Sequence, residues 1–304
     1  MFRKVMATLL ALVLVLAASL TIGFAVSTLE NPFFVTMKDA AVAKAAELGV
    51  ELVVLDAQDS AETQASQVED FITRGVDLLI INPVDSDAIG TSVMACNEAN
   101  IPVITVTRAS NAGTVVQHLD IDNKEAGRLD AEQLLKDLDG KGKVAILEGI
   151  AGSSSAIERE EGFVDALKGS EVEVVTSLTA NYSREEGATV TEDILQSNPE
   201  LDAIYAHNDE MALGAVRAVA AAGRSAEIKI YGIDATDDAL VAVENGEMAA
   251  TVQQQPDLQI ETALENAIKY LGGETLEPLV NIPLKLIVKE YLFSRLAPVN
   301  RMVN

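Results

Sequence analysis

The sequence predicts an α/β protein made of two doubly wound lobes with parallel sheets and a ligand cleft at the strand ends. After residue 20, short apolar runs alternate with longer helical patterns along the whole chain. This alternation is typical of βαβ units, in which helices cover both faces of a parallel sheet. About ten such runs exceed what one open sheet comfortably holds, so two lobes are expected.

Each element is placed by the period of its apolar residues and by the residues at its ends. In chain order, strands are expected at 22–26, 52–55, 78–81, 103–106, 144–147, 172–177, 203–205, 228–231, 249–253 and 284–288, with a strand-like stretch at 115–121. Helices are expected at 32–48, 61–74, 86–99, 122–138, 154–168, 184–196, 209–222, 236–245 and 257–271. Pro256 at a helix start, and Gly49 and Gly246 just past helix ends, support these limits. The lobe boundary is predicted near Ile121.

Residues 1–19 have the pattern of an export signal. Arg3 and Lys4 precede an apolar run over 6–18, and Ala17 and Ser19 are small residues suited to cleavage after Ser19. An uncleaved membrane anchor is the alternative, because the apolar run continues to about residue 26. Residues 22–27 fit a first strand of the folded domain better, which favours cleavage and an exported protein in the periplasm or outside the cell envelope.

Composition excludes several classes of function. The 304-residue chain has 22 Lys and Arg against 47 Asp and Glu, a net charge of −25, which argues against nucleic-acid binding through phosphate contacts. One Cys and two His residues exclude a Cys-rich zinc site and leave little for a His-based metal cluster. Neither a metal nor a cofactor is predicted.

Polar and aromatic side chains gather after the predicted strands, where open α/β sheets bind their ligands. Hydrogen-bonding groups at or near these positions are Ser27, Asn31, Asn82, Thr107, Arg108, Arg159, Asn208, Asp234 and Gln254, and the aromatic residues beside them are Phe33, Phe34 and Tyr182. Carboxylates, amides and guanidinium groups match the donors and acceptors of hydroxyl groups, and the C–H faces of a sugar ring can lie against aromatic rings. The set therefore favours a small polyhydroxylated ligand.

Enzymatic chemistry finds little support in the sequence. No dinucleotide fingerprint, Walker loop or nucleophile elbow is present. The Gly/Ser-rich stretch at 149–155 could hold an anion, but an ordinary strand-to-helix turn is the better interpretation. Asp209 and Glu210 could act as an acid and a base in principle, yet their position is typical of the first turn of a helix. No catalytic residue is assigned.

Seven strings occur in the order of one known family. They are VSTLENPFF at 26–34, INPVDSDAIG at 81–90, ANIPVITVTR at 99–108, GIAGSSSAIEREEGF at 149–163, HNDEMALGAVRA at 207–218, YGIDATDD at 231–238 and AATVQQQPD at 249–257. On these residues the chain resembles the ribose-binding members of the type I periplasmic binding proteins, over nearly all of 22–289.

The resemblance implies two Rossmann-like lobes that clamp a monosaccharide, either a ribose-like pentose or a related sugar, and deliver it to the membrane subunits of an ABC importer. The first lobe would comprise 20–121 and about 255–283, and the second about 122–254 and 284–289, with three crossovers. The resemblance places the family's ligand groups on Asn31, Arg108, Arg159, Asn208, Asp234 and Gln254. It places the stacking aromatic residues on Phe33, Phe34 and Tyr182, with Tyr182 where Phe is usual, and Ser27 and Asn82 would line the same cleft. Thr107 stands where the family pattern has Asp, so the affinity or the preferred sugar is expected to differ. Residues 290–304 extend past the family's usual end.

Two other binding functions share this fold. A chemotaxis or signalling receptor for a furanose-like ligand would differ from a transport protein in its docking surface, for example toward a chemoreceptor. An effector domain of a repressor would need a DNA-binding segment before residue 22, where the apolar leader stands instead.

Overall fold

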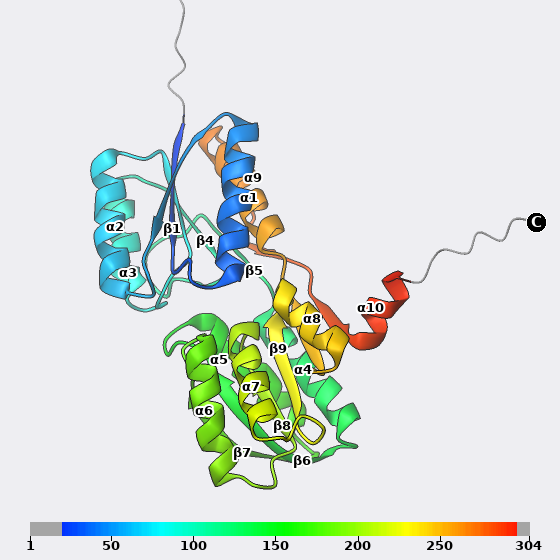
Figure 1. The fold of residues 1–304 in the computed structure, drawn as a ribbon. Helices are drawn as coiled ribbons and strands as arrows, with labels where there is room; N and C mark the ends of the chain where they lie inside the picture. Colours follow the sequence, from blue (N-terminus) through cyan, green and yellow to red (C-terminus); the bar gives the residue numbers. More distant parts are fainter. Residues whose placement is uncertain (1–19, 297–304) are drawn as a thin grey trace, which may run out of the picture.

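The computed structural model describes residues 20–296 and has two lobes, each built on one six-stranded sheet (Figure 1). The first sheet has the order β11-β5-β4-β3-β1-β2, and the second has the order β12-β10-β9-β8-β6-β7. The strands are β1 (Thr21–Val26), β2 (Glu51–Asp56), β3 (Leu78–Ile81), β4 (Val103–Val106), β5 (Gln117–Asp120), β6 (Lys141–Glu148), β7 (Glu171–Thr179), β8 (Ala203–Ala206), β9 (Lys229–Asp234), β10 (Ala250–Gln253), β11 (Leu279–Asn281) and β12 (Lys285–Val288). Within the described residues, neighbouring strands pair in parallel, except β10 and β12, which pair antiparallel.

Helices cover both faces of each sheet. They are α1 (Pro32–Leu48), α2 (Ala61–Arg74), α3 (Ile89–Glu98), α4 (Asn123–Asp137), α5 (Ser154–Leu167), α6 (Arg184–Ser197), α7 (Asp209–Ala221), α8 (Asp237–Asn245), α9 (Pro256–Leu271) and α10 (Lys289–Leu296). In the first lobe α1 packs with α9 on one face and α2 with α3 on the other (Figure 1). Buried residues alternate accordingly along a strand: Ile80 faces the α1/α9 side, and Leu79 and Ile81 face the α2/α3 side.

The chain passes between the two sheets three times. It leaves the first lobe between β5 and α4, returns between β10 and α9, and leaves again between β11 and β12. Asp234 and Gln254, at the ends of β9 and β10, therefore lie next to one of these connections.

The predicted α/β class and two-lobed architecture are confirmed, and most element limits agree within one or two residues. Two strands of the second sheet are longer than expected, at Lys141–Glu148 and Glu171–Thr179. The helix expected from residue 86 begins only at Ile89, because Asp85 Oδ1 accepts hydrogen bonds from the backbone N–H groups of Asp87 and Ala88 and forms a turn there.

Two elements near the C-terminus were not predicted. β11 is a three-residue edge strand that pairs with β5, and so short an element has no period to detect. α10 begins one residue before the segment 290–304, for which the sequence left a docked helix and a disordered tail as alternatives. Leu292 in this helix packs against the second-lobe core. The predicted export signal at 1–19 lies outside the described residues.

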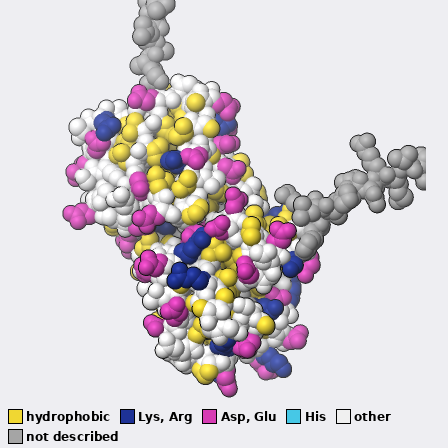
Figure 2. All heavy atoms as spheres, in the orientation of Figure 1, with side chains coloured by type: hydrophobic (Ala, Val, Ile, Leu, Met, Phe, Trp, Pro, Cys, Tyr) yellow, Lys and Arg dark blue, Asp and Glu magenta, His cyan; other side chains and the backbone are white. Residues whose placement is uncertain are grey.

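Acidic side chains are spread over the visible face of both lobes and are not gathered in one patch (Figure 2). Within residues 20–296, no helix combines the length and apolar character needed to cross a bilayer.

Candidate functional site

A small cavity of about 20 Å³ lies between the lobes and is lined by residues of both. Its wall consists of Asn31, Phe33, Phe34, Thr107, Arg108, Ser155, Arg159, Tyr182, Asn208, Asp234 and Gln254. Ten of these eleven residues belong to the set predicted from the sequence, and Ser155 is the exception. The volume admits about one water molecule, so the lobes must move apart before a larger ligand can enter.

The N-terminus of α1 provides one wall of the cavity. Asn31 caps the helix, because its side-chain oxygen accepts a hydrogen bond of 2.9 Å from the Phe33 N–H. Phe33 and Phe34 are buried, with their ring centroids 5.0 Å apart in an edge-to-face arrangement. The cap thus fixes both aromatic rings at the start of the helix.

Arg108 lies between aromatic rings of the two lobes. Its guanidinium carbon is 5.6 Å from the centroid of the Phe34 ring and 5.1 Å from that of the Tyr182 ring. One terminal nitrogen donates to the backbone oxygen of Pro83 at 3.0 Å, whereas the buried Nε has no partner among the described residues. Burial lowers the pKa of Arg108, against the opposing effects of Tyr182 and Asp59.

Two hydrogen bonds within the second lobe hold the Arg159 side chain in place. Its Nε donates to Asn123 at 2.9 Å, and a terminal nitrogen donates to the backbone oxygen of His207 at 2.6 Å. Asn208 caps α7, since its side-chain oxygen accepts from the Met211 N–H at 3.0 Å. These contacts fix both side chains at the cavity wall.

The hydroxyl group of Tyr182 has two hydrogen-bonding neighbours in the second lobe. The oxygen lies 3.0 Å from Ser155 Oγ and 3.3 Å from Ser153 Oγ. The ring lies directly against Gly149, where an added Cβ would be 2.1 Å from the ring carbon that carries the hydroxyl. Only glycine at 149 leaves room for the ring in this position.

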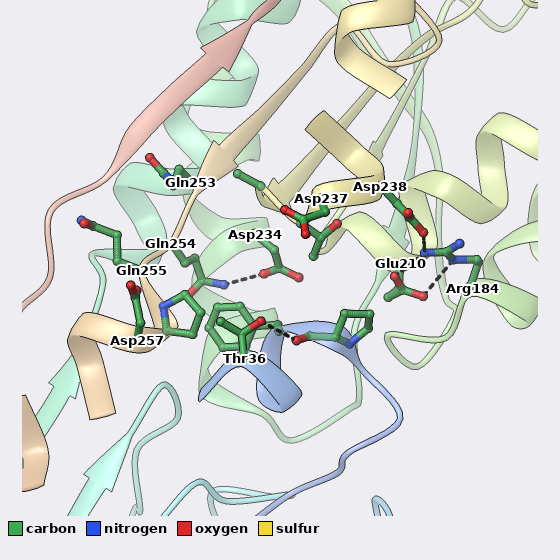
Figure 3. A pocket seen from close by; sticks show the side chains of 15 residues that line it. Thr36, Arg184, Glu210, Asp234, Asp237, Asp238, Gln253, Gln254, Gln255 and Asp257 are labelled. Carbon is green, nitrogen blue, oxygen red and sulfur yellow. Dashed lines mark hydrogen bonds and ion pairs between the residues drawn. The ribbon is translucent and has the colours of Figure 1, made fainter. Parts of the chain in front are cut away.

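Asp234 and Gln254 form a buried pair at the ends of adjacent strands (Figure 3). Gln254 Nε2 donates to Asp234 Oδ1 at 2.6 Å, which leaves Asp234 Oδ2 and Gln254 Oε1 buried without a partner in the described residues. Burial first, and then the charge of Asp209, raises the pKa of Asp234 well above its usual value. The pair therefore presents two unused acceptor atoms near the cavity.

Ser27 and Asn82 are buried but do not line the cavity. Asn82 Oδ1 accepts from the Ser27 N–H at 3.2 Å, and Asn82 Nδ2 donates to the backbone oxygen of Val106 at 3.1 Å. Both polar groups of the Asn82 side chain thus join the ends of neighbouring strands. The structure does not bring these two predicted residues together with the other ten.

Ser155 is a cavity residue that the sequence prediction omitted. It lies in the Gly/Ser-rich stretch, which was interpreted as a strand-to-helix turn, and Ser153 does cap α5 there. A tyrosine at 182 whose hydroxyl group needs a partner was the available signal for Ser155.

Two larger cavities flank the central one. One, of about 340 Å³, lies between the start of α1 and the loops after β9 and β10 (Figure 3). The other, of about 220 Å³, lies beside Arg108 and Tyr182. Arg184 lines both of these cavities. Its guanidinium group donates hydrogen bonds to the Glu210 carboxylate at 2.6 and 2.9 Å and to the Asp238 carboxylate at 2.9 Å.

His207 makes the stability of the protein depend on pH. Burial, followed by the charge of Arg159, lowers the pKa of His207 from 6.5 to about 3. Between these pH values the unfolded chain binds a proton at His207 that the folded chain does not bind. The neutral His207 therefore contributes to stability above pH 6.5, and this contribution is lost as the pH falls toward the folded-state pKa. From pH 7 to pH 5 we expect His207 to reduce the free energy of unfolding by about 2 kcal/mol.

Chemical denaturation of the wild type and of His207→Asn at both pH values tests this expectation. The variant should lack the decrease of about 2 kcal/mol. Asp209, whose pKa burial raises to about 6, acts in the opposite direction in both proteins, so the difference between them isolates His207. Equal pH dependence in the two proteins would contradict the assignment.

The comparisons with known proteins place this arrangement in a family. The family model for the periplasmic binding protein domain matches residues 22–275. The ribose import binding protein RbsB of Haemophilus influenzae is 46% identical, covering 88% of this chain and 91% of the relative. RbsB of Escherichia coli is 43% identical, covering 89% and 91%.

Solved structures give the same result. The myo-inositol binding protein of Caulobacter, bound to myo-inositol, has a TM-score of 0.87 and 36% identity, covering 90% of this chain and 95% of that one. A solute binding protein of Actinobacillus succinogenes, with bound D-allose, has a TM-score of 0.86 and 31% identity, covering 91% and 100%. The chain belongs to the periplasmic binding protein family.

Proposed function

We propose that this protein captures a monosaccharide, a ribose-like pentose or a related sugar, between its lobes and delivers it to an ABC importer. The observation that carries this proposal is the set of unused hydrogen-bonding atoms around the central cavity. Arg108 Nε, Asp234 Oδ2 and Gln254 Oε1 are all buried without a partner among the described residues. Each such atom costs about 1–3 kcal/mol, which a bound hydroxyl group can recover.

The sugar class is supported by what surrounds these atoms. One donor and two acceptors match hydroxyl groups, which both donate and accept, and three aromatic rings border the same small volume. The proposed ligand-binding residues are the ten predicted residues that line the central cavity, together with Ser155. Ser27 and Asn82 instead support the strand ends. Relatives named for ribose import match the chain over nearly its whole length.

Isothermal titration calorimetry against D-ribose, D-allose, L-arabinose, D-glucose and myo-inositol tests the function. We expect at least one of the pentoses or hexoses to bind with a dissociation constant in the micromolar range or below. A related test is sugar uptake by cells that carry the cognate importer genes, with and without this protein. Absence of binding by every sugar at millimolar concentration would refute the proposal.

Closure of the lobes should depend on Gly152. Its backbone oxygen accepts from the Ser86 N–H of the other lobe at 3.1 Å, and an added Cβ would lie 2.3 Å from Asp85 Oδ2. Gly152→Ala therefore places a methyl group in the contact between the lobes. We expect about ten-fold weaker sugar binding by calorimetry, because the closed form is disfavoured.

Gly169→Ala is a matched control. Gly169 has φ +86°, nearly the +85° of Gly152, but a Cβ there meets nothing within 4 Å. Both variants thus carry the same backbone strain, and only Gly152→Ala obstructs closure. Equal sugar affinities of the two variants would show that strain, and not contact between the lobes, determines the effect.

We further propose that residues 1–19 direct export and are removed, and that the lobes comprise 20–121 with about 255–283, and about 122–254 with 284–289. The three connections between the sheets support these boundaries. N-terminal sequencing of the exported protein should return a start at Leu20.

A further inference from the structure

Thr107 and Gln259 form a hydrogen-bonded pair at the edge of the central cavity. Thr107 follows β4 and lines the cavity, whereas Gln259 is fully buried on α9, outside the cavity wall. The Thr107 hydroxyl group donates to Gln259 Oε1 at 2.9 Å. Gln259 Nε2 has no acceptor within residues 20–296. A buried amide whose NH2 group has no acceptor for either of its two N–H donors is costly, so its presence calls for a role.

The backbone holds Thr107 firmly in this arrangement. Its φ is +65°, a left-handed conformation that is unusual for a β-branched residue. The Thr107 N–H donates to the backbone oxygen of Leu119 at 2.9 Å, which ties the strained residue to the neighbouring strand. With the backbone fixed, the direction of the Thr107 O–H bond is set by its hydrogen bond to Gln259 Oε1.

The pair has a consequence for the ligand. A threonine hydroxyl has one proton and two lone pairs. When that proton goes to Gln259, only the lone pairs face the cavity, so Thr107 can accept a hydrogen bond but cannot donate one. Building on the proposed function, we propose that Gln259 is a positioning residue that makes Thr107 an obligate acceptor, and that the site thereby selects a sugar with a hydroxyl donor at this contact.

The test compares each sugar with its deoxy analogues. The tightest-binding sugar and its set of monodeoxy derivatives are titrated into the wild type, Thr107→Val, Gln259→Leu and the double variant. In the wild type, the derivative that lacks the contacting hydroxyl should bind about five-fold more weakly than the sugar through loss of this bond alone. This ratio should fall below about two-fold in Thr107→Val and in the double variant, and should lie between that value and the wild-type ratio in Gln259→Leu.

The double-mutant cycle separates positioning from packing. Gln259→Leu should weaken binding of the parent sugar by about three- to five-fold when Thr107 is present, and by less than about two-fold in the Thr107→Val background. The melting temperature of the unliganded Gln259→Leu protein should not decrease, because the change also removes the unsatisfied Nε2. Equal losses in both backgrounds, or an unchanged deoxy ratio, would overturn the proposal.

The outcomes also distinguish this inference from the proposed function. Binding of a sugar with no Gln259-dependent ratio at any deoxy position refutes the role of Gln259 and leaves sugar capture intact. Failure of every sugar to bind refutes both.

Discussion

Arg108→Ala is expected to weaken sugar binding by at least about 100-fold while the protein still folds. The guanidinium group lies between Phe34 of the first lobe and Tyr182 of the second, and its buried Nε has no protein partner in the described residues. Charge-assisted hydrogen bonds contribute about 1.5–3 kcal/mol each, so the loss of two such bonds to a sugar accounts for this factor. The variant also removes a contact that closed lobes share.

Calorimetry measures the affinity, and circular dichroism with a thermal scan measures the fold. Arg74→Ala is the control, because Arg74 is an exposed arginine whose ion pair with Asp70 lies on the outer surface of α2. Surface pairs of this kind contribute little. If Arg108→Ala binds within about ten-fold of the wild type, Arg108 is not a ligand residue and the assignment of the cavity fails.

Asp234→Ala is expected to have an effect of similar size. It removes the unpartnered Oδ2 acceptor and also leaves Gln254 Nε2 without its 2.6 Å partner, so two groups of the cavity are lost together. We expect binding to weaken at least about 100-fold. Asp234→Asn keeps an acceptor oxygen without the charge and should retain part of the affinity.

Asp257→Ala provides the comparison for Asp234. Asp257 lines the flanking cavity at the start of α9 and is absent from the wall of the central one. Its removal should alter sugar affinity by less than about three-fold, a change that fits the loss of a distant surface charge. A larger effect of Asp257→Ala than of Asp234→Ala would move the proposed sugar site into the flanking cavity.

Most of the fold could be predicted because the signals are local and repeated. Apolar runs such as 78–81 are completely buried, and glycines such as Gly49 adopt the left-handed conformation that ends a helix. β11 was not predicted because a strand of three residues has no detectable period. α10 was not assigned because a short helix after the last strand depends on the core against which it packs. Local patterns cannot report such contacts.

The candidate site shows the same division. Strand ends can be located from sequence, and the topology then brings them to one edge of each sheet, which accounts for most of the ten predicted cavity residues. Arg159 lies inside α5 and was predicted from the family resemblance. Sequence cannot tell whether an amide at such a position turns toward the ligand or toward a neighbouring strand. Asn82 does the second, because its two polar groups join Ser27 and Val106. Gln259 was not predicted because it lies within α9, away from any strand end, and only the folded chain brings it to Thr107.

The return of the chain to the first lobe has a consequence for biosynthesis. That lobe takes α9 and its edge strand β11 from residues 256–281, so one helix of its covering layer and one edge of its sheet are supplied last. A ribosome that has made the first 250 residues has produced a first lobe with the apolar surface that α9 covers still exposed to water. Completion of this lobe therefore waits for nearly the whole chain, which keeps the emerging polypeptide incompletely folded until synthesis is almost finished.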